Sequence, residues 1–166
     1  MSDFQNNAAK ISIASLDGGP TVEAMYNPKE LQVDRSVPWQ KKNQANQGNT
    51  SENGIHLEFT GAEGRSVTVE LLFDGWEDNT SISSWVADLE TLASVIDASS
   101  TAENKRRPHR CVVTWGTTIQ NFRCVIESLS TKYTMFAEDG TPMRATCTVK
   151  LKEADVVSMA QQKGGG

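Results

Sequence analysis

The chain has 166 residues, of which 37% are hydrophobic and 22% are charged, and its formal net charge is -5. This length fits one domain with room for a sizeable core. Because phosphate binding requires a dense positive surface, an acidic chain without a clustered basic face is a poor candidate for a nucleic-acid binder.

Apolar residues occur only in short runs along the chain. These runs are far shorter than the roughly 20 residues that a membrane-spanning helix needs, so we expect no direct membrane insertion. The N-terminal residues show no cationic region followed by an apolar block, which predicts the absence of a secretory signal. We therefore expect synthesis and assembly in the cytoplasm, with any release from the cell by lysis.

The cysteines are Cys111, Cys124 and Cys147. An odd number in a chain without a secretory signal argues against a disulfide framework, and the spacing lacks the CxxC pairs typical of zinc sites. Each cysteine falls on the inward face of a predicted strand. We expect these side chains to act as small hydrophobic groups rather than as nucleophiles.

The first elements form a predicted hairpin. Alternating apolar and polar residues predict a strand over residues 10–16. The sequence Asp-Gly-Gly-Pro at residues 17–20 predicts a turn, and residues 21–26 return as a second strand. The Asn-Pro pair that follows breaks this strand.

A long polar segment covers residues 40–54, where one alanine is the only apolar side chain. Such a segment cannot bury a face, so we expect a loop or an arm. Loops of this length inside a compact domain are uncommon and are usually functional.

Two strands and a helix follow this arm. Period-two alternation over residues 55–60 and again over residues 67–73 predicts strands with one buried face. Residues 81–96 carry one apolar stripe at spacings of three and four, which predicts an amphipathic helix. Asn79, Thr80 and Ser81 are the candidates for its N-cap. The stripe consists of Ile82, Trp85, Val86, Leu89, Leu92, Ala93 and Ile96.

The remaining chain returns to strand patterns after a polar stretch over residues 98–110, which ends in a basic run at residues 105–110. Asp139-Gly140 carries the signature of a hairpin turn. The predicted inward faces are Cys111, Val113 and Trp115, then Phe122, Cys124 and Ile126, then Ala145, Cys147, Val149 and Leu151. Beyond these strands, residues 154–166 are predicted to be a flexible tail.

The order of strands, one helix and further strands predicts a mainly β (α+β) fold. We expect residues 1–153 to form one domain of two packed antiparallel sheets, or a barrel, with one flanking helix.

Candidate catalytic groups are sparse. The two histidines are His56, on the predicted solvent face of a strand, and His109, in the basic loop, and both are expected to be exposed polar residues. None of the common nucleophile, zinc-protease or nucleotide-binding motifs occurs. We therefore expect no enzymatic activity, no cofactor and no metal.

Other polar and aromatic residues have structural interpretations. Glu23, Glu58 and Glu70 alternate with apolar residues and favour a solvated or inter-subunit face over an acid–base pair. The basic run at residues 105–110 lacks interleaved aromatic residues and favours a loop or an interface contact over nucleic-acid binding.

Of the four tryptophans, Trp85 and Trp115 fit core faces, whereas Trp39 and Trp76 follow strand ends and fit either the core or an interface.

Four segments together resemble the tube-protein domain of contractile injection systems and of related contractile phage tails. Their order and spacing around one helix carry the resemblance, which covers most of residues 10–153. The segments are residues 26–31 (Tyr-Asn-Pro-Lys-Glu-Leu) with Trp39 downstream, residues 71–74 (Leu-Leu-Phe-Asp), residues 107–116 with Arg107-Pro108 and Val113-Thr114-Trp115-Gly116, and residues 136–145 around Asp139-Gly140.

The resemblance implies a hexameric ring in which strands of the subunits form one continuous barrel around a channel. Such proteins polymerise as the inner tube, or act as the tube initiator that joins the baseplate hub to the first tube ring. The implied partners are further copies of the chain, adjacent tube rings, hub and spike proteins, and the sheath. Many relatives carry a C-terminal LysM module that this sequence lacks, so peptidoglycan binding is not carried over.

A structural ring subunit is the preferred hypothesis. A monomeric carbohydrate- or peptide-binding module is the alternative, and it requires Trp39 and Trp76 to lie in one groove. The helix is expected to pack on the sheet through Trp85, Leu89 and Leu92. The candidate subunit-interface residues are Trp39, Lys41, Lys42, Arg106, Arg107, Asp139 and Arg144.

Overall fold

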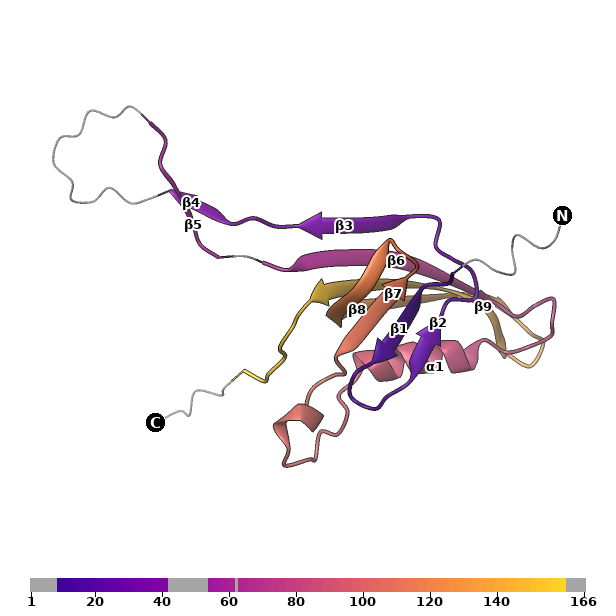
Figure 1. Ribbon diagram of the computed structural model, residues 1–166. Helices are drawn as coiled ribbons and strands as arrows, with labels where there is room; N and C mark the ends of the chain where they lie inside the picture. The colour runs from indigo at the N-terminus through magenta and orange to yellow at the C-terminus, as the bar shows by residue number, and fades with distance from the viewer. Residues whose placement is uncertain (1–8, 42–53, 62, 161–166) are drawn as a thin grey trace.

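The computed structural model describes residues 9–41, 54–61 and 63–160 (Figure 1). The chain forms nine strands, one α-helix and one short 3-10 helix within these residues. The elements are β1 (Ser12–Ser15), β2 (Thr21–Glu23), β3 (Leu31–Arg35), β4 (Trp39–Lys41), β5 (Leu57–Phe59), β6 (Arg65–Asp74), α1 (Ser83–Ala93), η1 (Glu103–Lys105), β7 (Cys111–Trp115), β8 (Ile119–Phe136) and β9 (Pro142–Glu153).

The strands form two antiparallel sheets of very different size. The larger sheet has the order β2-β1-β7-β8-β9-β6-β3, and the smaller one pairs β4 with β5. With one α-helix beside them, these sheets confirm the mainly β, α+β fold class. The smaller sheet is a two-stranded ribbon that extends beyond β3 and β6 at one end of the larger sheet (Figure 1), and a single core lies between the larger sheet and α1.

The core follows the predicted alternation along β6 and β9. Val67, Val69, Leu71 and Phe73 are buried on β6, opposite the buried residues from Ala145 to Leu151 on β9. Because side chains of a strand alternate between its two faces, the residues between them form the outer face of the same sheet, which is polar except at Leu72. The predicted inward faces of β7 and β8 are also confirmed through Cys111, Val113, Phe122 and Cys124.

The helix packs as its stripe predicts. Leu89 and Leu92 are fully buried, and the rings of Trp85 and Phe73 stack with their centroids 6.3 Å apart. The helix ends at Ala93, earlier than the stripe suggested, because Val95 forms a β-bridge with Pro108 instead of continuing the helix.

Two turns fix the ends of the sheet. The Asp139-Gly140 turn joins β8 to β9, and Gly140 has a φ of 86°, a conformation that glycine adopts without strain. The β1–β2 hairpin is also confirmed. Residues 154–160 form neither helix nor strand, and the Met159 amide donates a hydrogen bond to Glu103 Oε1 at 2.9 Å.

Candidate subunit interface

The β4–β5 ribbon exposes an apolar face. Trp39 pairs with Phe59 and Lys41 pairs with Leu57, and the rings of Trp39 and Phe59 lie 5.4 Å apart. The exposed fractions of Trp39, Leu57 and Phe59 are 55%, 55% and 49%. The predicted burial of one face over residues 55–60 is therefore wrong for the described part of one chain, because the ribbon leaves the larger sheet and none of the described elements packs over this face.

The predicted polar arm borders this ribbon. Gln40 and Lys41 belong to β4, and Gly54 lies before β5. Residues 42–53, which include the interface candidate Lys42, lie outside the described residues.

The larger sheet has two open edges. Among the described strands, β2 pairs only with β1, and β3 pairs only with β6. The outer side of each edge strand presents its main-chain N–H and C=O groups outward. A strand of another chain can pair with these groups, so an edge strand is a template for association. Four of the five residues of β3 are exposed, including Val33 at 50%.

The basic run between η1 and β7 is partly internal. Arg107 is only 7% exposed, and its guanidinium donates to Asp17 Oδ2 at 2.9 Å. The Arg110 amide donates to the same oxygen at 2.7 Å. His109, predicted to be an exposed loop residue, is instead 5% exposed, with Nδ1 2.8 Å from Ser15 Oγ. That prediction is wrong because the run folds against the β1–β2 turn, and the same packing leaves little of the Arg107 side chain exposed in the single chain.

Two opposing influences act on the Asp17 carboxyl. Burial raises its pKa, but the hydrogen bonds from Arg107 and from the Arg110 amide, together with their positive charges, outweigh this effect and hold the pKa below its ordinary value. Asp17 thus stays ionised between two arginines. The sequence predicts only a turn residue at Asp17 and gives no sign of the ion pair, since Arg107 lies 90 residues away in the chain.

The remaining candidates lie in separate places. Arg144, one of the interface candidates, forms an ion pair with Asp74 of its own chain at 2.9 Å. Asp139 is exposed at the tip of the β8–β9 turn and accepts a hydrogen bond from the Thr141 amide at 3.0 Å. Arg106 is exposed just after η1. The structure therefore brings only Trp39 and Lys41 together on one surface.

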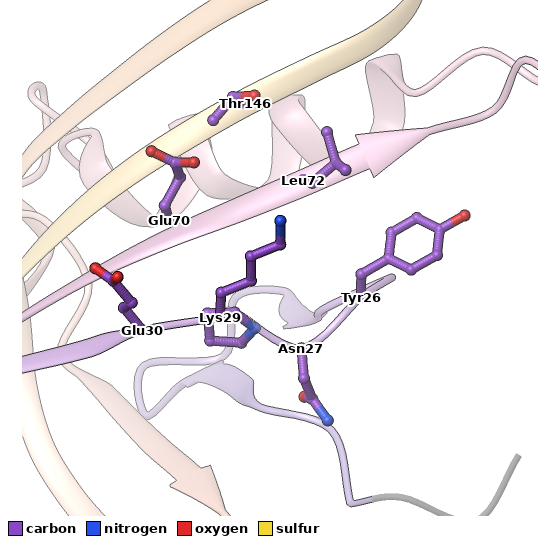
Figure 2. Close-up of a pocket in the computed structure, with 8 residues that line it drawn as sticks. Tyr26, Asn27, Lys29, Glu30, Glu70, Leu72 and Thr146 are labelled. Carbon is purple, nitrogen blue, oxygen red and sulfur yellow. The ribbon is translucent and has the colours of Figure 1, made fainter. Parts of the chain in front are cut away.

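A cavity of about 490 Å³ lies between the β2–β3 linker and the outer face of β6 and β9 (Figure 2). We call it the linker pocket. Its lining residues are Tyr26, Asn27, Pro28, Lys29, Glu30, Glu70, Leu72 and Thr146.

Trp39 and Trp76 lie at opposite ends of the sheet. Trp39 belongs to the ribbon beyond the Arg65 end of β6, whereas Trp76 follows the other end of β6 at Asp74. The ten residues of β6 separate them by about 30 Å at roughly 3.3 Å per residue. The single groove that the carbohydrate-binding alternative requires is therefore not formed.

The cysteines are free and buried. Burial raises the pKa of Cys111 to about 12 and also raises the pKa values of Cys124 and Cys147, which keeps all three as unreactive thiols. No group of three histidine, cysteine or acidic residues is placed to hold a metal ion within the described residues.

We expect the native chain to react slowly with a thiol reagent such as Ellman's reagent. On unfolding, all three thiols should become accessible and react. As a control, Ser84→Cys on the exposed side of α1 should add one thiol that reacts at once. Rapid reaction of the unsubstituted native chain would contradict the burial of these side chains.

Within the same part of the chain, none of the helices has both the length and the hydrophobicity that crossing a bilayer requires.

Within the described residues, the sheet has an edge strand without a second partner on each side, and the apolar ribbon is exposed. Such surfaces are typical of a structural subunit that buries them against other chains. The chain belongs to the family described as contractile injection system tube protein, whose family model matches residues 5–162. Comparison with curated proteins finds no match. The family confirms the resemblance and gives the chain a structural role in the tube of a phage tail-like particle, together with other tube or baseplate components.

Proposed function

We propose that the chain forms a hexameric ring, either of the inner tube or of the tube initiator that joins the baseplate hub to the tube. The observation that carries this proposal is the seven-stranded sheet whose edge strands, β2 and β3, each pair with only one other described strand. The two edges are different surfaces, so pairing between copies is head-to-tail. A head-to-tail contact closes into a ring when its rotation allows closure.

A structural role without catalysis is part of this proposal. The membership of a tube-protein family supports it, and so does the burial of the cysteines and of His109. The hydrogen bonds of Asp17, Asp74 and Asp139 explain their lowered pKa values as parts of turns and ion pairs.

The test is the mass of the purified assembly by light scattering, followed by electron microscopy of the same fraction. We expect six-fold rings or stacked tubes built from the 18.2 kDa chain. Tubes formed by the chain alone would favour the tube subunit, whereas rings formed only with a hub protein would favour the initiator. A chain that stays monomeric at micromolar concentration, with and without hub proteins, would contradict the proposal.

An edge variant sharpens this test. Val33→Lys places a charge on the exposed edge strand β3, and charged side chains on edges oppose pairing with another strand. We expect this variant to shift the assembly strongly toward monomer at unchanged thermal stability. Ala87→Lys, which adds the same charge on the exposed side of α1, is the matched control and should assemble normally.

A further inference from the structure

The apolar face of the ribbon carries one positive charge. Residues on one face of a strand are two apart, so Trp39 and Lys41 share the face that Phe59 and Leu57 complete on β5. We call these four residues the ribbon face. The opposite face holds the pair Gln40 and Glu58, which is polar. A two-stranded ribbon is only marginally stable alone in water, so the ribbon face requires a covering surface.

The linker pocket combines apolar walls with unpaired charges. Tyr26 and Leu72 are 51% and 39% exposed. Figure 2 shows the Lys29 side chain rising from the linker toward β6, with Glu30 and Glu70 on one side of it and Leu72 and Tyr26 on the other. These three charged groups form no ion pair within the described chain, and together they carry a net charge of −1 (two carboxylates and one ammonium).

The ribbon face cannot reach the linker pocket of its own chain. The first residue of β3, Leu31, pairs with Val69, so Glu70 of the linker pocket lies level with the start of β3. The ribbon begins at the other end of β3, beyond the Arg35–Arg65 pair. About ten residues of extended chain separate Lys41 from this level, on the order of 30 Å. Figure 1 shows β3 and β6 running side by side between the two places.

We propose that the ribbon face of one copy docks in the linker pocket of a second copy, with Lys41 beside Glu70 and Glu30 and with Trp39 against Tyr26 and Leu72. This inference rests on the proposed function and names the contact between successive subunits. The ribbon supplies one positive charge and a large aromatic ring, and the pocket supplies a net negative charge and apolar walls. Such complementarity selects the partner and sets its register.

The contact is head-to-tail, because the ribbon and the pocket lie at opposite ends of β6. A contact of this type uses one surface of each kind per copy and therefore continues from copy to copy. A buried tryptophan covers about 150–250 Å², and tryptophan is one of the residues that most often dominate the energetics of interfaces.

Cysteine cross-linking tests this contact directly. Lys41→Cys combined with Glu70→Cys in one chain should form disulfides between copies under mild oxidation, since a disulfide needs Cα atoms closer than about 7 Å. The matched control is Gln40→Cys with Glu70→Cys, because Gln40 lies on the opposite face of the ribbon. The native cysteines are buried and do not compete. We expect at least about fivefold more linked chains for the first pair than for the control.

Three outcomes are decisive in this experiment. Preferential linking through residue 41 supports the inference. Wild-type assembly with equal or absent linking overturns the inference and leaves the ring proposal standing. A wild-type chain that remains monomeric with and without hub proteins overturns both.

A charge exchange gives a second readout. Lys41→Glu should weaken assembly about tenfold, the effect of about 1.4 kcal/mol, because it sets a carboxylate against Glu30 and Glu70. Adding Glu70→Lys to the same chain should restore most of the assembly. Both positions are exposed in the single chain, so the thermal midpoint of the monomer should not change. Failure of the second substitution to rescue the first would overturn the inference.

Discussion

Replacing Asp17 with alanine should lower the free energy of unfolding by about 3–5 kcal/mol, because it leaves the charge of a buried arginine without its partner. The side chains of Asp17 and Arg107 are 13% and 8% exposed, and their contact is 2.9 Å long. Asp17 also accepts the hydrogen bond of the Arg110 amide. Urea denaturation of the separated monomer measures the effect.

The Arg65–Glu153 pair provides the matched control. Its side chains are 42% and 30% exposed, and solvent screens such a pair, so Glu153→Gln should cost no more than about 1 kcal/mol. Equal losses for Asp17→Ala and Glu153→Gln would show that the Asp17 cluster is not a buried ion pair.

The same cluster predicts a pH dependence. The pKa of Asp17 in the folded chain lies below its ordinary value near 3.8. Its contribution to stability is therefore fully present well above pH 3.8 and is lost as the pH falls through the lower folded value. The stability difference between the wild type and Asp17→Asn should shrink on moving from pH 7 to pH 3. A difference that stays constant over this range would contradict ionisation of Asp17 in the folded chain.

The sequence predicts those parts of the fold whose signal is local. Three such features are confirmed: the alternation along β6 and β9, the apolar stripe of α1 and the Asp139-Gly140 turn. Each of these patterns depends on residues that are near one another in the sequence. Long-range contacts leave no such signal. His109 is buried by Ser15, which lies 94 residues away, and nothing in the local basic run indicates this.

The ribbon shows a second limit of sequence patterns. Alternation over residues 55–60 indicates that the two faces of a strand differ, but it does not indicate what covers the apolar face. Among the described residues of one chain, Leu57 and Phe59 remain about half exposed. In a subunit completed by its neighbours, the same pattern is consistent with burial between chains. Of the interface candidates within the described residues, Trp39 and Lys41 therefore remain together, whereas Arg107 and Arg144 bond within their own chain.

Adjacent residues of β6 should separate folding from assembly. Phe73 is fully buried against Trp85, so Phe73→Ala should lower the free energy of unfolding by about 3–5 kcal/mol. Leu72 points to the other face of the strand and lines the linker pocket. Leu72→Ala should change the stability of the monomer by no more than about 0.5 kcal/mol.

The two substitutions should affect assembly in the opposite order, provided that both variants are compared as folded monomers. Leu72→Ala removes an apolar wall of the docking site and should weaken association between copies, whereas Phe73→Ala, studied at a temperature where it remains folded, should leave the association constant nearly unchanged. Analytical ultracentrifugation of both variants measures this. If Leu72→Ala assembles like the wild type, the outer face of β6 takes no part in the contact, and the ring must be held by its edge strands alone.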